Sequence, residues 1–150
     1  MLRNKLVLAT HNLHKQKEMN SILSSLGILI VGLDEFPQIG DIEETGTTLL
    51  ENAYIKARTV SELTGLPSIA DDTGLEIEVL GGAPGVYSAR YAGEDCKAED
   101  NMQKVLEKLE HEDNRNARFR TVIALIINGE ENLFEGECLG KITKNKDARG

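Results

Sequence analysis

The stretch LVLATHNLHK, residues 6–15, carries the signals that decide the fold. Residues 6–9 are a short apolar run typical of a buried strand, and the polar residues 10–12 predict a turn into a helix. Gly27 then provides a helix stop, and residues 28–31 are again apolar. Strand, helix and strand in this order predict a right-handed βαβ unit. The amphipathic face of the helix is expected to comprise Met19, Ile22, Leu23 and Leu26.

A second helix is predicted after the acidic, glycine-containing loop of residues 34–46. Thr47 or Thr48 is expected to cap it, with Glu51 completing a capping box, and Gly65 to end it. Its apolar stripe is expected to comprise Leu50, Ala53, Ala57, Val60 and Leu63.

The rest of the chain continues to alternate strand and helix signals. A short strand at residues 67–70 is expected to end at Asp71, and residues 75–79 alternate apolar and acidic side chains like a half-exposed strand. Residues 81–85 predict a rigid turn. The remaining expected elements are a third helix with Met102, Val105, Leu106 and Leu109 on one face, a strand at 121–127, a hairpin turn at Asn128-Gly129 and a return strand at 132–137. The sequence therefore predicts an α/β fold with a mixed central sheet flanked by helices, in a single domain over residues 1–150.

Composition narrows the functional classes. The net charge of −8 over 150 residues argues against a nucleic-acid-binding protein, because such proteins carry basic patches that neutralise phosphates. No apolar run has the length of a secretory leader or a membrane span, and Cys96 and Cys138 form no metal-ligand spacing. We expect a cytoplasmic protein with free thiols and no membrane partner. An acidic protein that handles a polyanion needs local positive charge, from placed lysines or arginines or from a metal ion.

The first candidate site is the turn at residues 10–15. A strand that opens directly into a helix leaves backbone N–H groups unpaired at the helix N-terminus, where phosphates bind. Thr10 and Asn12 can add side-chain hydrogen bonds, and Lys15 can add a positive charge. The alternative is a capped helix with a solvated lysine.

The second candidate site is Asp71-Asp72-Thr73-Gly74. Two adjacent carboxylates repel each other unless a cation or hydrogen bonds hold them. Asp72 can bind Mg²⁺, which takes one or two protein carboxylates, or it can act as a general base towards water. An acidic turn is the alternative, because Asp and Gly favour turns.

The third candidate site is Glu43-Glu44-Thr45-Gly46, just before the second helix. It is either a second source of carboxylates for a metal ion or an acidic segment that favours the helix dipole. Lys56 either contacts a phosphate or is an exposed, solubilising lysine. His11, His14 and His111 have no metal-ligand spacing, so none of them is assigned to a metal.

Five blocks, in order along the chain, resemble the motifs of the inosine/xanthosine triphosphate pyrophosphatase (ITPase) family, of the dITP/XTP pyrophosphatase type. The third and fourth blocks are the most specific. The blocks are LATHNLHK at 8–15, EETG at 43–46 with ENA at 51–53 and KA at 56–57, IADDTGL at 69–75, GAPGVYSARYAG at 82–93, and the weaker ARFR at 117–120.

The resemblance implies a two-lobed α/β fold with the nucleotide between the lobes, Mg²⁺ as cofactor and a homodimer. It implies hydrolysis of the deaminated purine nucleotides ITP, dITP and XTP to the monophosphate and pyrophosphate, which clears them from the nucleotide pool. Carried over residue by residue, it makes Asp72 the proton acceptor and a metal ligand, with Glu43 or Glu44 as a further ligand. The substrate contacts that it implies are Thr10, His11, Asn12, Leu13, His14, Lys15, Lys56 and Thr73.

The sequence departs from the family pattern in several places. His14 stands where glycine is frequent, and Thr73 stands where serine is usual. No phenylalanine-glycine-tyrosine-aspartate-proline block and no serine-histidine-arginine block precedes the end at Arg149-Gly150. We therefore expect a C-terminally incomplete domain that turns ITP over slowly or not at all, and base preference stays open.

Two alternatives belong to other functional classes. One is a catalytically silent nucleotide-binding module. The other is an aspartyl-phosphate phosphatase with Asp71 or Asp72 as nucleophile, which the threonine at position 73 disfavours because that chemistry usually places a second aspartate two residues after the first.

Overall fold

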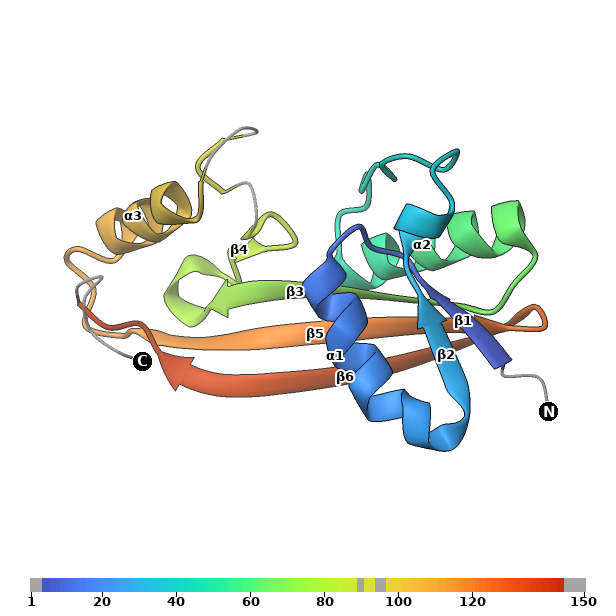
Figure 1. Cartoon of the computed structure of the whole chain (residues 1–150). Helices are drawn as coiled ribbons and strands as arrows, with labels where there is room; N and C mark the ends of the chain where they lie inside the picture. Colours follow the sequence, from blue (N-terminus) through green and yellow to red (C-terminus); the bar gives the residue numbers. More distant parts are fainter. Residues whose placement is uncertain (1–3, 89–90, 94–96, 145–150) are drawn as a thin grey trace. The chain divides into compact units, whose positions relative to one another are not determined.

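The computed structural model describes residues 4–88, 91–93 and 97–144 (Figure 1). Its helices and strands are β1 (Asn4–Leu8), α1 (Leu13–Leu23), β2 (Ile28–Val31), α2 (Leu49–Thr64), β3 (Ser68–Ile77), β4 (Pro84–Gly85), α3 (Ala98–Lys108), β5 (Asn116–Ile127) and β6 (Glu130–Lys141). Short 3₁₀ helices lie at Ser24–Leu26, Leu33–Glu35 and Glu78–Leu80. No helix in these described ranges has the length and apolar character to cross a membrane.

The strands form one mixed sheet in the order β2-β1-β3-β5-β6, with β4 paired to β3. Strand β1 runs parallel to both β2 and β3, whereas β4 is antiparallel to β3. The parallel β1–β2 pair with α1 between them in sequence confirms the predicted βαβ unit. Together with the helices beside the sheet (Figure 1), it confirms the predicted α/β class.

The residues group into two compact units. The first contains Met1–Asp72 and Val122–Phe134, and the second contains Thr73–Thr121 and Glu135–Gly150. Strands β3, β5 and β6 contribute residues to both units. Two units agree with the two lobes that the family resemblance implies.

In the first unit, α1 and α2 cover opposite faces of the sheet. Ile69 belongs to the apolar cluster that packs against α1. Its neighbour Ser68 is fully buried, and its Oγ donates a hydrogen bond of 2.7 Å to the carbonyl of Ala57 in α2. Since successive side chains of a strand point to opposite faces, the two contacts place the two helices on the two sides. In this cluster Met19 and Leu23 of α1 pack against Leu6, Leu8 and Ile30 of the sheet.

The predicted apolar face of α1 is only partly right. Ile22 and Leu26 are 67% and 70% exposed. Asn20 instead lies on the covered side, where its amide bonds both the N–H and the carbonyl of Ile30. Because α1 ends at Leu23 and continues as a 3₁₀ turn, Leu26 is rotated off the helical face.

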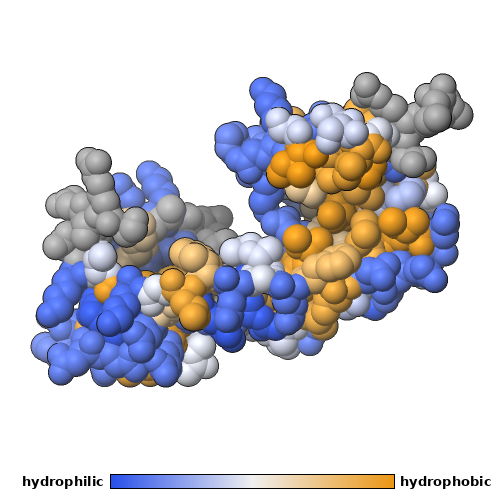
Figure 2. Space-filling model, turned by 90° about the horizontal axis from the view of Figure 1, so that it is seen from below, coloured by the Kyte–Doolittle hydropathy of each residue, from blue (hydrophilic) through white to orange (hydrophobic). Residues whose placement is uncertain are grey.

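Figure 2 shows apolar surface on one face of the molecule. The exposed large apolar side chains among the described residues include Leu13, Ile22, Leu26, Leu63, Phe119, Phe134 and Leu139.

Strand β3 is longer than predicted. Residues 71–74, for which an acidic turn was one of the two alternatives, are part of one continuous strand from Ser68 to Ile77, and Val79 falls in a 3₁₀ helix rather than in a strand. The reason is pairing: β3 has β1, β4 and β5 as neighbours in the sheet. Ladder hydrogen bonds from long-range partners override the local turn preference of aspartate and glycine.

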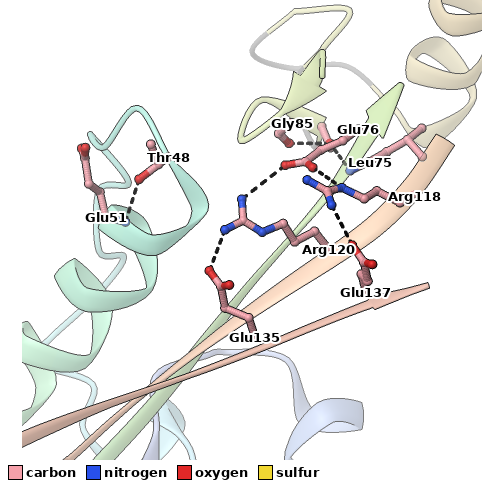
Figure 3. Close-up of polar contacts among 10 residues, drawn as sticks. Thr48, Glu51, Leu75, Glu76, Gly85, Arg118, Arg120, Glu135 and Glu137 are labelled. Atoms are coloured by element: carbon pink, nitrogen blue, oxygen red, sulfur yellow. Dashed lines mark hydrogen bonds and ion pairs between the residues drawn. The ribbon is translucent and has the colours of Figure 1, made fainter. Parts of the chain in front are cut away.

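The predicted helix ends and the hairpin are confirmed. Gly27 and Gly65 are left-handed, with φ of 76° and 69°, at the two expected C-terminal stops. Asn128 and Gly129 have φ of 53° and 81°, the positive values that a two-residue hairpin turn needs. Thr48 caps α2, since its Oγ1 accepts a 3.1 Å hydrogen bond from the Glu51 N–H (Figure 3).

The second unit packs α3 on its part of the sheet. Val105 of α3 and Leu109, the residue that caps its C-terminal end, form a buried cluster with Ile77 of β3. Met102, predicted for the same face, is 45% exposed. Arginines of β5 join the strands: Arg118 bonds Glu76 and Glu137 at 2.6 and 2.7 Å, and Arg120 bonds Glu135 at 2.6 Å (Figure 3). Cys138 is an exposed free thiol, whereas Cys96, Ala89 and Arg90 lie outside the described residues.

A matched pair of substitutions tests the corrected face of α1 and the core beneath it. Ile30→Ala, at a side chain that is 1% exposed, is expected to lower the free energy of unfolding by about 2–4 kcal/mol, because it leaves a cavity. Ile22→Ala makes the same chemical change at an exposed site and is expected to cost less than about 0.5 kcal/mol. Urea unfolding followed by circular dichroism measures both. A loss at Ile22 as large as that at Ile30 would contradict the exposed position of Ile22.

Candidate functional site

The site begins where β1 stops and β3 continues. The last parallel pairs between these strands are Val7 with Ser68 and Leu8 with Ile69. Beyond them β1 gives way to the turn into α1, while β3 runs on through Asp71 and Asp72. The two aspartates therefore lie beside the carboxyl end of β1, where ligands of parallel sheets bind, although they are inside a strand and not beyond its end.

The turn before α1 is already internally bonded. Asn12 is the N-cap of α1, and its Oδ1 accepts hydrogen bonds from the N–H groups of His14 and Lys15 at 3.0 and 3.2 Å. The N–H of Asn12 in turn donates to Thr10 Oγ1 at 3.1 Å. The structure therefore shows the capped helix, and these two amide groups must exchange partners before they can bind a phosphate.

The other residues of the turn point to different partners. His11 Nε2 lies 2.9 Å from the Gly40 carbonyl and 3.5 Å from Asp41. His14 Nε2 lies 2.8 Å from Glu18 one helical turn on, and Leu13 is 57% exposed. The predicted substrate contacts therefore separate into Thr10, Asn12 and Lys15, which bond one another or the aspartates, and three outward-facing residues.

Two lysines hold Asp71 and the acidic loop. Lys15 Nζ lies 2.7 Å from Asp71 Oδ2. Lys56 Nζ donates a 2.6 Å hydrogen bond to the Asp71 carbonyl and lies 2.9 Å from Glu44 Oε1. Lys56 is mostly buried, with a side chain only 14% exposed, so it is no solubilising surface lysine. The fold brings together residues from α1, α2, β3 and the loop before α2.

Asp72 has an unusual electrostatic environment. Burial raises the pKa of its carboxyl from 3.8 to about 6, and the negative charges of Glu44 and Asp71 act in the same direction. The charge of Lys56 and the side chain of Asn52 oppose the rise. A carboxyl that titrates near pH 6 is mostly ionised at neutral pH and still basic enough to accept a proton.

Two buried polar atoms of the site have no hydrogen-bond partner among the described residues: Asp72 Oδ2 and Asn52 Nδ2. Buried polar groups without a partner are rare in folded proteins and need an explanation, such as an ion or a reacting group. Asn52 is fully buried, and its Oδ1 accepts a 2.7 Å hydrogen bond from the Gly46 N–H.

The two glutamates of the loop differ. Glu44 is half-buried, pairs with Lys56 and affects Asp72, whereas Glu43 is exposed. Thr73 is exposed, and its Oγ1 lies 2.9 Å from Thr121 Oγ1 in the second unit. Within the described part of the chain, no three His, Cys, Asp or Glu side chains converge as ready metal ligands.

Sequence reasoning overlooked Asn52 and the separation of the two aspartates. Asn52 occupies a core position of α2, three residues after Leu49 and five before Ala57, both of them buried. A polar residue at apolar spacing was the available signal. No local sequence pattern indicated that the side chains of Asp71 and Asp72 point to opposite faces of the sheet. Their directions follow from strand alternation in β3, and their partners from the helices on each side.

The arrangement supplies a base and cations in one place. A carboxyl with a raised pKa can take a proton from water, and the ammonium groups of Lys15 and Lys56 can bind an anion. Three carboxylates, those of Glu44, Asp71 and Asp72, against these two ammonium groups leave one excess negative charge. A polyanionic ligand therefore needs a further cation here.

Comparisons with known proteins show which family the chain resembles. A model of the Ham1 family matches residues 6–150. A dITP/XTP pyrophosphatase of Christiangramia forsetii is 51% identical over 142 residues, which are 95% of this chain and 74% of the relative. A dITP/XTP pyrophosphatase of Escherichia coli O157:H7 is 46% identical over 151 residues, covering 97% of this chain and 76% of the relative.

Solved structures give the same result. The Staphylococcus aureus Ham1 protein matches with a TM-score of 0.89 at 36% identity, over 98% of this chain and 76% of that chain. A HAM1 protein from Coxiella burnetii matches with a TM-score of 0.89 at 44% identity, over 95% of this chain and 74% of that chain. The resemblance inferred from the sequence blocks is confirmed, and the chain belongs to the Ham1 family.

Proposed function

We propose that the chain hydrolyses the nucleoside triphosphates ITP, dITP and XTP to the monophosphate and pyrophosphate. The observation that carries the proposal is the half-buried Asp72, whose pKa is about 6 and whose buried Oδ2 has no partner among the described residues. The preference for deaminated purines rests on the relatives, which are named dITP/XTP pyrophosphatases. Homodimer formation, a cytoplasmic location and the absence of nucleic-acid partners stay predictions.

We propose Mg²⁺ as the cofactor, held by Asp72 and Glu44. The carboxylates of Asp72 and the half-buried Glu44 are hard oxygen donors, which fit a cation that takes one or two protein carboxylates and completes its shell with water and phosphate. When bound, Mg²⁺ supplies positive charge that stabilises phosphate oxygens. It would also compensate the excess negative charge of the site.

The chain's own residues would divide the remaining work. Asp72 accepts the proton of the attacking water. Lys15 and Lys56 exchange their carboxylate partners for phosphate oxygens. Thr10 and Asn12 add hydrogen bonds from the turn before α1, and Thr73 adds a hydroxyl contact to the substrate.

The activity is tested by pyrophosphate release from ITP, dITP, XTP, ATP and GTP with Mg²⁺. Asp72→Asn is expected to lower kcat for ITP by about 10²-fold or more, because it removes the proton acceptor. Asp113→Asn, the same change at an exposed position, serves as the matched control and should behave as the wild type. Thermal stabilisation by ITP without pyrophosphate release would instead favour a silent nucleotide-binding module.

A second pair of variants separates the two glutamates. Glu44→Gln is expected to raise the Mg²⁺ concentration needed for half-maximal activity by about 10-fold or more, because a carboxylate near Asp72 is lost. Glu43→Gln, at the exposed neighbour, is expected to change it by less than about twofold. Equal effects of both substitutions, or a larger effect at Glu43, would refute the choice of Glu44.

Asp72 also predicts a dependence of stability on pH in metal-free buffer. The folded-state pKa of about 6 exceeds the ordinary value of 3.8, so the folded state binds the proton more tightly and loses stability as pH rises from about 4 to above 6. Asp72→Asn removes this cost. After allowance for solvent screening, we expect it to gain on the order of 1 kcal/mol, or about 2–4 °C in Tm, at pH 8 and nothing at pH 4.

The neighbouring aspartate provides the control for this measurement. Asp71→Asn loses the ion pair with Lys15 and should gain no stability at pH 8. Thermal unfolding in EDTA at the two pH values compares both variants with the wild type. An Asp72→Asn protein that is less stable than the wild type at pH 8 would contradict the raised pKa.

A further inference from the structure

Asn52 is a fully buried polar residue in the middle of the core face of α2. Burying an amide is costly unless it is hydrogen-bonded. Only one end of this amide is satisfied, by the 2.7 Å hydrogen bond from the Gly46 N–H to Oδ1. The other end, Nδ2, has no partner among the described residues.

The chemistry of this hydrogen bond fixes which way the amide points. A backbone N–H can donate only to the oxygen of the side-chain amide, so the oxygen must face Gly46. The NH₂ group then faces away from the loop. Asn52 lies beside Asp72, where it favours the charged carboxylate, and the buried Oδ2 of Asp72 likewise has no hydrogen-bond partner in the described part of the chain.

Gly46 is built to receive Asn52. A Cβ at position 46 would lie 2.7 Å from Asn52 Oδ1 and 2.6 Å from the Cβ of Glu51, distances that real side chains do not tolerate. Gly46 has no positive φ, so the glycine is needed for close approach and not for backbone freedom. Since Gly46 follows Glu44 by two residues, the contact ties the acidic loop to the first turn of α2.

We propose that Asn52 is a positioning residue that couples the acidic loop to Asp72. Its Oδ1 holds Gly46 and thereby places Glu44, while its Nδ2 is the donor that orients the inner oxygen of Asp72. The outer oxygen of Asp72 then stays available for the ligand. The effect of Asn52 on catalysis rests on the proposed function. Its effect on the positions of Glu44 and Asp72 can be tested by metal binding, without any hydrolysis.

The test compares Asn52→Leu with Asn20→Leu. Leucine is close to asparagine in size and removes both hydrogen-bonding groups. Asn20 of α1 is the matched control, because its amide bonds the N–H and carbonyl of Ile30 at 2.9 and 3.1 Å, away from the aspartates. Three quantities are measured: Tm, the Kd of Mn²⁺ alone by electron paramagnetic resonance, and kcat and KM for ITP with Mg²⁺.

Both substitutions should lower Tm, but only Asn52→Leu should change the site. We expect it to raise the Kd of Mn²⁺ and to lower kcat, each by about 10- to 100-fold, as found for residues that orient metal ligands. Asn20→Leu should leave both within about twofold of the wild type. Unchanged Mn²⁺ affinity in Asn52→Leu, or equal changes in the two variants, would overturn the proposal.

Two further outcomes are distinguishable. If the wild type releases no pyrophosphate, the proposed function fails, yet a loss of Mn²⁺ affinity confined to Asn52→Leu still supports the positioning role. If Asn52→Leu does not fold, Asn52→Asp keeps the acceptor for Gly46 and replaces the donor with a carboxylate oxygen that repels Asp72. That variant should lower kcat by about tenfold or more with KM within about threefold, and wild-type kcat would overturn the proposal.

Discussion

The unequal length of β1 and β3 is the constraint on which the site depends. Because β1 ends at Leu8 while its parallel neighbour continues to Ile77, two positions of β3 beside that end are free to carry carboxylates. Strand alternation then sends Asp71 to Lys15 of α1 and leaves Asp72 with Asn52 and Lys56 of α2. Adjacent like charges are thus separated by the backbone without any turn.

Burial makes these carboxylates chemically different. Asp71 has an ion pair with Lys15, whereas Asp72 is held in a less hydrated place where its charge is disfavoured. A carboxyl with a pKa near 6 and a half-buried glutamate both lower the stability of the folded state. Residues that lower stability in this way are typical of functional sites. The same cost makes the site receptive to a cation.

Small details of packing support this chemistry. The glycine at position 46 lets the acidic loop approach α2 closely, and the buried amide of Asn52 satisfies the loop on one side while facing Asp72 on the other. The turn before α1 is stabilised in the same way, by the cap of Asn12 and the hydroxyl of Thr10. Both ends of the site are thus held by side-chain to backbone hydrogen bonds at the N-terminal ends of helices.

Periodicity, glycine stops and the Asn128-Gly129 turn were enough to predict the helices, the parallel βαβ unit and the hairpin, because these depend on local backbone preferences. The motif blocks were enough to predict the family and the candidate residues. Local sequence could not show that residues 71–74 are strand, that Ile22 is exposed, or that Glu44 and not Glu43 faces Lys56. Those features depend on which strand lies beside β3, where α1 ends and how the loop packs on α2. Only the tertiary structure decides them, because pairing and burial between distant segments outweigh the preferences of single residues.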